Sequence, residues 1–135
     1  MKLDNKWRQK TLETLENDYW DKPDYDSHLV KRCHELRKIP LENFTTEDLR
    51  IMIGQQISLD YLIPLALDVL TKDLFAEGDF FEGDLLKNVL AINTAFWDSN
   101  KSYWTILDSL MKYRRNEIEA HKFDTSNFEQ SIHRQ

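Results

Sequence analysis

The most apolar stretch of the chain is DYLIPLALDVLTKDLFA, residues 60–76, and it decides the fold. Apolar side chains fall on nearly every side of a helix drawn through it, which is typical of a helix buried at the centre of a protein. Pro64 comes near the expected first turn, where the missing N–H of proline does least harm. The run contains Asp60 and Asp68 and is much shorter than the roughly 20 apolar residues of a membrane span. These residues therefore predict a central buried helix.

Apolar residues at three- and four-residue steps predict further helices before this stretch. We expect these helices over 7–20, 27–37 and 45–56. Pro23 and Pro40 end the first two, because the residue before a proline avoids helical dihedral angles. Asp26 or Ser27 can cap the second helix, and Thr45, which is followed by acids in the first turn, can cap the third.

After the central stretch the pattern predicts shorter helices and one long one. Asp84 is expected to cap a short helix, and Asn93 is expected to cap a turn. A long helix is expected over 102–120, where apolar residues again follow helical spacing. The polar tail, 122–135, contains Phe128, which could dock a final turn onto the core.

Length and composition agree with this helical interpretation. Glycine and proline number only three each, too few turn-forming residues for a many-stranded sandwich or barrel. A chain of 135 residues is long enough to bury one core without a metal or a disulfide. The sequence therefore predicts an all-α fold, an irregular bundle of about six helices, with residues 1–135 forming a single domain.

The charge and the cysteine content limit the possible partners and the compartment. The formal net charge of −6 disfavours nucleic acid, whose binding depends on Lys and Arg, and it suits a basic protein partner, although mild acidity also simply aids solubility. Cys33 is the only cysteine, so no internal disulfide forms. Residues 1–7 have no apolar signal core. We expect a cytoplasmic protein that binds neither nucleic acid nor membranes.

No motif for catalysis or for a cofactor is present in the sequence. Cys33 and His34 are adjacent and His28 lies six residues earlier, which is poor spacing for a shared metal site, so no metal or cofactor is expected. Carboxylate pairs, which could do acid–base chemistry, are interpreted as loop acids and helix caps. The protein is therefore expected not to be an enzyme. The acids concerned are Asp24 with Asp26, and Asp79 with Asp84.

Two clusters combine acids with aromatic residues, one within residues 13–26 and the other within 77–84. Aromatic anchors inside a charged rim are typical of a surface that docks a basic protein. Trp20 and Phe80 are interpreted instead as closing the core. The predicted contact residues are Asp18, Tyr19, Asp21, Asp24, Asp79, Phe81, Glu82 and Asp84.

Several stretches of the chain resemble the immunity proteins of contact-dependent growth inhibition (CDI) systems. The likeness covers residues 11–97, and the later part is described by helical periodicity alone. The matching stretches are LENDYW (15–20), PDYDSHLV (23–30), CHELR (33–37), FTTEDLRIMIGQQI (44–57), YLIPLAL (61–67) and AEGDFFEGDLLKNVL (76–90).

The resemblance implies a function and a partner. In these systems a cell injects the C-terminal toxin domain of a large surface protein into its neighbours, and the cytoplasmic immunity protein binds and neutralises that domain. The toxin domains are commonly basic nucleases, so the resemblance implies a 1:1 complex between this acidic chain and its cognate toxin domain. A helical adaptor that binds a different protein would explain the same composition.

Overall fold

The computed structural model describes residues 6–21 and 27–133. Within these ranges the chain forms α-helices, two short 3-10 helices, turns and loops, with no strand, so the all-α prediction is confirmed. In chain order the helices are η1 (Trp7–Gln9), α1 (Leu12–Glu16), α2 (His28–Leu36), η2 (Leu41–Asn43), α3 (Thr46–Gly54), α4 (Leu59–Lys72), α5 (Asp84–Leu90), α6 (Thr94–Ser99), α7 (Lys101–Lys112), α8 (Arg115–His121) and α9 (Ser126–His133).

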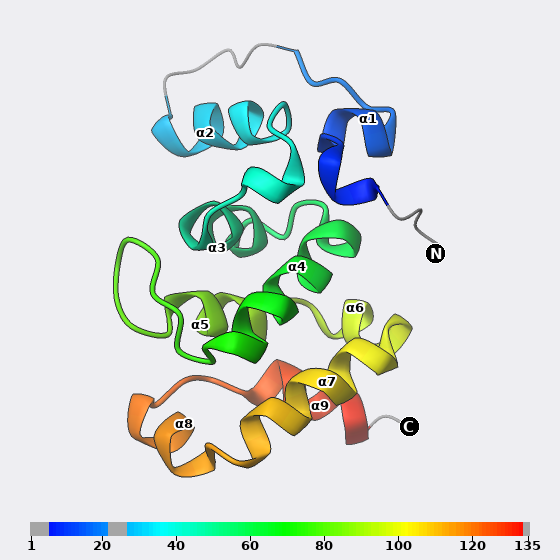
Figure 1. Cartoon of the computed structure of the whole chain (residues 1–135). Helices are drawn as coiled ribbons and strands as arrows, with labels where there is room; N and C mark the ends of the chain where they lie inside the picture. The colour runs from blue at the N-terminus through cyan, green and yellow to red at the C-terminus, as the bar shows by residue number, and fades with distance from the viewer. Residues whose placement is uncertain (1–5, 22–26, 134–135) are drawn as a thin grey trace.

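The predicted central helix is α4, which crosses the middle of the molecule and packs against α3, α5 and α7 (Figure 1). Its side chains Leu62, Ile63 and Ala66 are fully buried, and burying one large aliphatic side chain stabilises a fold by roughly 1.5–3 kcal/mol. Pro64 is the sixth residue of α4, beyond the first turn, so the carbonyl of Asp60 receives no N–H from residue 64. Extensive burial on several sides holds α4 together through this gap.

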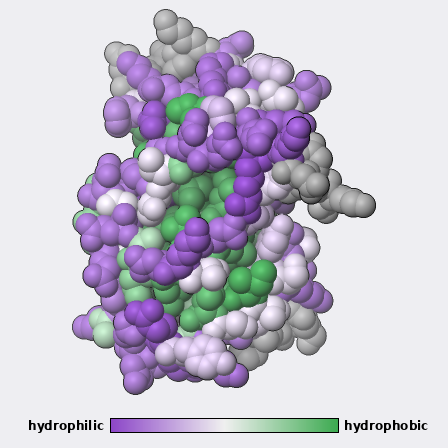
Figure 2. Space-filling view, viewed as in Figure 1, coloured by the Kyte–Doolittle hydropathy of each residue, from purple (hydrophilic) through white to green (hydrophobic). Residues whose placement is uncertain are grey.

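The other helices lie on two sides of α4. In Figure 1, α1, α2 and α3 lie on one side, and α7, α8 and α9 lie on the other. One cluster of buried apolar residues joins them, from Leu12 in α1 to Phe128 in α9. Figure 2 shows that hydrophilic residues cover the rim of this view, while hydrophobic residues gather in the middle of the face, where α4 crosses. Among the described residues, no helix is both long and apolar enough to span a bilayer.

The first predicted helix, 7–20, is wrong in extent, because the structure divides it into η1 and α1. Lys10 and Thr11 are extended, and the Thr11 hydroxyl accepts a hydrogen bond from the Thr14 amide at 3.2 Å, which starts a new helix. Asn17 adopts the left-handed conformation, with φ of 51°, and ends α1. The residues that follow Asn17 are therefore not helical.

The predicted caps are confirmed at three helices and wrong at one. Ser27 caps α2, Thr45 forms a capping box with Asp48 at α3, and Asn93 caps α6 through the Phe96 amide at 2.7 Å. The alternative cap Asp26 lies outside the described residues. Asp84 is not a cap: Gly83, with φ of 87°, occupies that position, and Asp84 is the first residue of α5. Glycine adopts this positive φ without steric cost.

The predicted helix 102–120 is divided into α7 and α8 around Tyr113 and Arg114. The residues at this break are polar or, like Tyr113, almost fully exposed, so no core packing holds one continuous helix there. The tail then returns as α9 and buries Phe128, whose carbonyl accepts a hydrogen bond from Trp104 Nε1 at 2.8 Å while the two rings stack. The docking of Phe128 is therefore confirmed.

Candidate partner-binding surfaces

The two acidic–aromatic clusters occupy different parts of the molecule. We call residues 18–21 the N-terminal acidic segment and residues 77–83 the acidic loop. In Figure 1 the segment follows α1, the loop projects beside α5, and α2 and α3 lie between them. The structure therefore does not bring the predicted contact residues together into one patch. Asp24, a predicted contact residue, lies outside the described residues.

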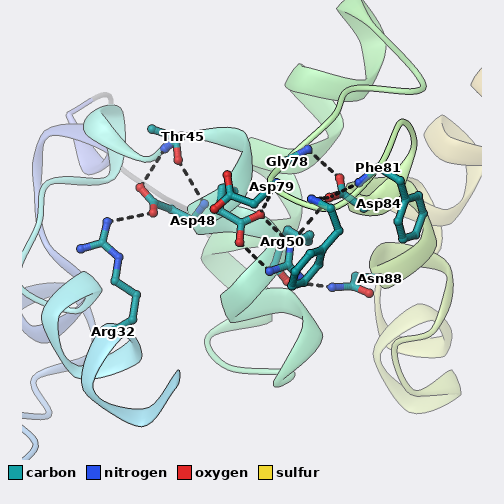
Figure 3. Close-up of polar contacts among 11 residues, drawn as sticks. Arg32, Thr45, Asp48, Arg50, Gly78, Asp79, Phe81, Asp84 and Asn88 are labelled. Atoms are coloured by element: carbon teal, nitrogen blue, oxygen red, sulfur yellow. Dashed lines mark hydrogen bonds and ion pairs between the residues drawn. The ribbon is translucent and has the colours of Figure 1, made fainter. Parts of the chain in front are cut away.

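Asp84 holds the acidic loop from inside the protein (Figure 3). Its carboxylate accepts hydrogen bonds from the backbone amides of Gly78 at 2.7 Å, Phe80 at 3.0 Å and Phe81 at 3.4 Å. Only 2% of Asp84 is exposed, so its prediction as a residue that touches a partner is corrected. Hydrogen bonds to an ionised acceptor are stronger than neutral ones, so this carboxylate fixes the loop conformation instead.

Glu47 and Arg50 of α3 form a second support beneath the acidic loop. Glu47 accepts a hydrogen bond from the Asp79 amide at 2.8 Å and pairs with Arg50 through two bonds, at 2.6 and 2.5 Å. The hydrogen bond from Arg50 is the main reason that the pKa of Glu47 lies below its ordinary value, against the opposing effect of burial. Arg50 also lies 4.2 Å from the centre of the Phe80 ring. Four consecutive backbone amides of the loop are thus held by two carboxylates.

The acidic loop presents two aromatic rings to solvent. Phe80 is 70% exposed and Phe81 is 41% exposed, so the interpretation of Phe80 as closing the core is wrong. The Arg50 guanidinium lies over the Phe80 ring, and the Lys87 ammonium lies over the Phe81 ring, 5.5 Å from its centre. Solvent-exposed carboxyl residues flank the rings: Glu77, Asp79 and Glu82. The predicted contact residues Asp79, Phe81 and Glu82 therefore lie on one accessible loop.

A buried cation holds the N-terminal acidic segment. Arg37 is only 1% exposed, and its guanidinium donates to the Asp18 carbonyl at 2.6 Å and to Glu16 at 2.5 Å. The Trp20 ring lies 4.4 Å from this guanidinium, and Trp20 Nε1 donates to the Asp18 carboxylate at 3.3 Å. Trp20 is thus half-buried, in agreement with its predicted packing role. Tyr19, between these two residues, is 61% exposed.

Two of the residues that shape the acidic loop were missed as members of a site. From the sequence, Glu47 is interpreted as an acid in the first turn of a helix, and Arg50 is given no role. Their spacing of three residues on a predicted helix is the one signal that could have paired them. The hydrogen bond between Arg37 and Asp18 joins residues 19 positions apart, and no local pattern predicts it.

Among the described residues, potential metal ligands do not converge, and the thiol of Cys33 is buried. No group of three or more His, Cys, Asp or Glu residues in the described ranges is arranged to hold a metal ion. Cys33 is 4% exposed, in agreement with its prediction as a buried apolar residue, and burial raises the pKa of its thiol, which makes it a poor nucleophile. Rigid loops that display aromatic rings and carboxylates are suited to recognition of a protein.

Comparison with known families identifies the chain. No curated protein and no solved structure matches it significantly. A family model described as CDI immunity proteins matches residues 14–107, which is more than half of the chain. The family consists of non-enzymatic inhibitors, and membership implies a cognate CDI toxin as the partner. The chain therefore belongs to the CDI immunity proteins.

Proposed function

We propose that this protein acts in the cytoplasm as a stoichiometric inhibitor that binds the C-terminal toxin domain of its cognate CDI effector, in a 1:1 complex. The family match over residues 14–107 carries the proposal. The match also favours an immunity protein over a general helical adaptor. A nuclease is the toxin class that best suits the chain, because a net charge of −6 complements a basic, nucleic-acid-binding active site.

The contact residues that we propose are Asp18, Tyr19 and Asp21 of the N-terminal acidic segment, Asp24 beyond it, and Asp79, Phe81 and Glu82 of the acidic loop. The exposure of Tyr19 and Phe81 supports their use as anchors, because aromatic rings supply much contact area with little loss of side-chain entropy. Asp84 contributes by shaping the loop and not by contact. Both regions are held in place before binding, which lowers the entropic cost of association.

Co-purification with the toxin domain encoded directly upstream tests the function. We expect a 1:1 complex with a Kd of about 1 nM or lower, which corresponds to about −12 kcal/mol, because one escaped toxin molecule can harm the cell. Calorimetry at two salt concentrations should show weaker binding at the higher one. Failure to bind would contradict the proposed function.

A charge-reversed double variant tests the acidic loop. Asp79→Lys with Glu82→Lys should slow association with a basic toxin domain by about tenfold, because charge complementarity acts mainly on the association rate. The matched control is Glu42→Lys with Glu119→Lys, which changes the net charge equally at two exposed acids elsewhere. Stopped-flow association rates compare the two variants. Equal slowing in both would mean that only net charge matters and that the loop makes no local contact.

A further inference from the structure

A groove of about 980 Å3 runs along α3, between α2 on one side and the acidic loop on the other. Leu29 of α2, which is 39% exposed, forms one wall, and Phe80 forms the other. Ile51, which is partly exposed, lies on the floor between them. Exposed large apolar side chains on opposite walls of one groove are a feature of protein recognition, where an apolar anchor of the partner inserts between them.

The groove carries a net negative charge. Four carboxylates line it, Glu35, Glu47, Asp48 and Asp79, against the two guanidinium groups of Arg32 and Arg50. Both guanidinium groups are engaged inside the groove: Arg32 pairs with Asp48 at 3.0 Å, and Arg50 pairs with Glu47 at 2.5 Å. The exposed acids Glu35 and Asp79 lie at the two walls, where a partner's cation can reach them. Glu35 also lies 3.6 Å from Arg32, an ion pair within α2 that leaves 63% of the Glu35 side chain exposed.

Internal hydrogen bonds keep the groove in shape. In Figure 3, Arg32 reaches Asp48 from α2 on one side of α3, while the acidic loop lies on the other side. Asn88 of α5 donates to the Arg50 carbonyl at 2.9 Å and lies so close to Gly54 that a Cβ there would be 2.8 Å from the Asn88 amide nitrogen. The walls and floor are therefore fixed to one another, as preorganised binding requires.

We propose that this groove binds a basic segment of the toxin domain, with an apolar side chain of that segment between Leu29 and Phe80 and a Lys or Arg on each side, near Glu35 and Asp79. The inference rests on the proposed function and deepens it. It extends the contact surface from the acidic loop onto α2 and α3. The net negative charge of the groove favours a basic occupant. The two apolar walls favour a segment that inserts an apolar side chain, in preference to a partner held by charge alone.

Two single variants, each with a matched control, test the groove. Leu29→Arg and Phe80→Arg each replace one apolar wall of the groove by a cation. Each variant should therefore bind the upstream-encoded toxin domain at least tenfold more weakly. Ile106→Arg and Tyr113→Arg are the controls, because these side chains are similarly exposed, at 44% and 86%, and lie outside the groove. Calorimetry should find the controls within about threefold of the unaltered protein.

Hydrogen exchange on the complex with the unaltered protein gives a second, variant-free readout. Protection of residues 28–35, residues 50–56 and the acidic loop, in addition to the N-terminal acidic segment, is the expected footprint. If the unaltered protein binds tightly but the groove variants bind like their controls, the groove is wrong and the immunity function stands. The groove proposal would also be overturned if Tyr19→Arg abolishes binding and the complex shows no protection in the groove. That result would place the contact on the N-terminal acidic segment. No binding by the unaltered protein would overturn both proposals.

Discussion

The acidic loop and the N-terminal acidic segment display the same kinds of side chain, but opposite charges hold them from inside. Beneath the loop, the carboxylates of Asp84 and Glu47 accept hydrogen bonds from consecutive backbone amides. Beneath the segment, the guanidinium of Arg37 donates to a backbone carbonyl of Asp18. In both regions an aromatic ring covers an arginine, Phe80 over Arg50 and Trp20 over Arg37.

Acids that are close together in the sequence have separate roles when one lies at the surface and the other is buried. Asp79 and Asp84 belong to one acidic run, yet Asp79 is exposed and Asp84 is buried. The exposed acids set the charge that a partner meets, and the buried groups set the shape that presents those acids. The two regions differ in the sign of the buried charge and in its partners, and three measurements sharpen that difference.

Removing Arg37 should have the largest effect. Arg37→Ala leaves Glu16 without its buried partner and the Asp18 carbonyl without its donor, so the free energy of unfolding should fall by about 3 kcal/mol. Arg8→Ala is the control, because Arg8 and its partner Asp68 are both exposed, and the loss of this pair should cost about 0.5 kcal/mol. Urea unfolding measures both, and equal losses would contradict the central role of the buried cation.

Removing Asp84 should have an intermediate effect. Asp84→Ala leaves three loop amides without an acceptor, and the expected loss of stability is about 2 kcal/mol. The amides of Gly78, Phe80 and Phe81 should also exchange faster with deuterium. The exposed Asp79→Ala should change stability by less than about 0.5 kcal/mol. Unchanged exchange in Asp84→Ala would show that other contacts fix the loop.

The pH dependence of the Glu47–Arg50 pair should be the smallest effect. Because the folded-state pKa of Glu47 lies below its ordinary value of 4.5, the ionised pair stabilises the fold above pH 4.5, and this stability is lost as the pH falls through the lowered value. The stability difference between the unaltered protein and Glu47→Gln should therefore be constant above pH 4.5 and shrink below it. Glu42→Gln, an exposed acid outside this network, is the control.

A direct titration of Glu47 checks the same point. Nuclear magnetic resonance of the Glu47 side-chain carbonyl carbon should report a midpoint below 4.5. A midpoint at or above that value would contradict the support that Arg50 gives to the acidic loop.

Much of the helical content could be predicted because it depends on local signals. The buried helix around Leu62 follows from apolar residues on all sides, and Thr45 and Asn93 mark helix starts because their side chains bond amides three residues later. The division of 102–120 into α7 and α8 could not be predicted, since no glycine or proline marks it. It depends on which apolar side chains find a core to pack against.

The candidate site was predicted in composition but not in geometry. Acids and aromatic residues near Tyr19 and Phe81 stand out in the sequence, and the structure places both side chains at the surface. Sequence reasoning misplaced Phe80 and Asp84, because exposure and burial within one short loop depend on what lies beneath it. The groove between Leu29 and Phe80 joins residues 51 positions apart, which no local pattern connects.

By itself, the sequence determined the helical class, the principal caps, the acidic charge and the resemblance to immunity proteins, because each follows from residue type and short-range spacing. The tertiary structure alone decided that Arg37 lies beneath Asp18, that Asp84 and Glu47 hold the acidic loop, and that Phe80 and Leu29 line one groove along α3. The physical reason is that burial and charge pairing are properties of contacts between distant segments, and those contacts form only when the core is packed.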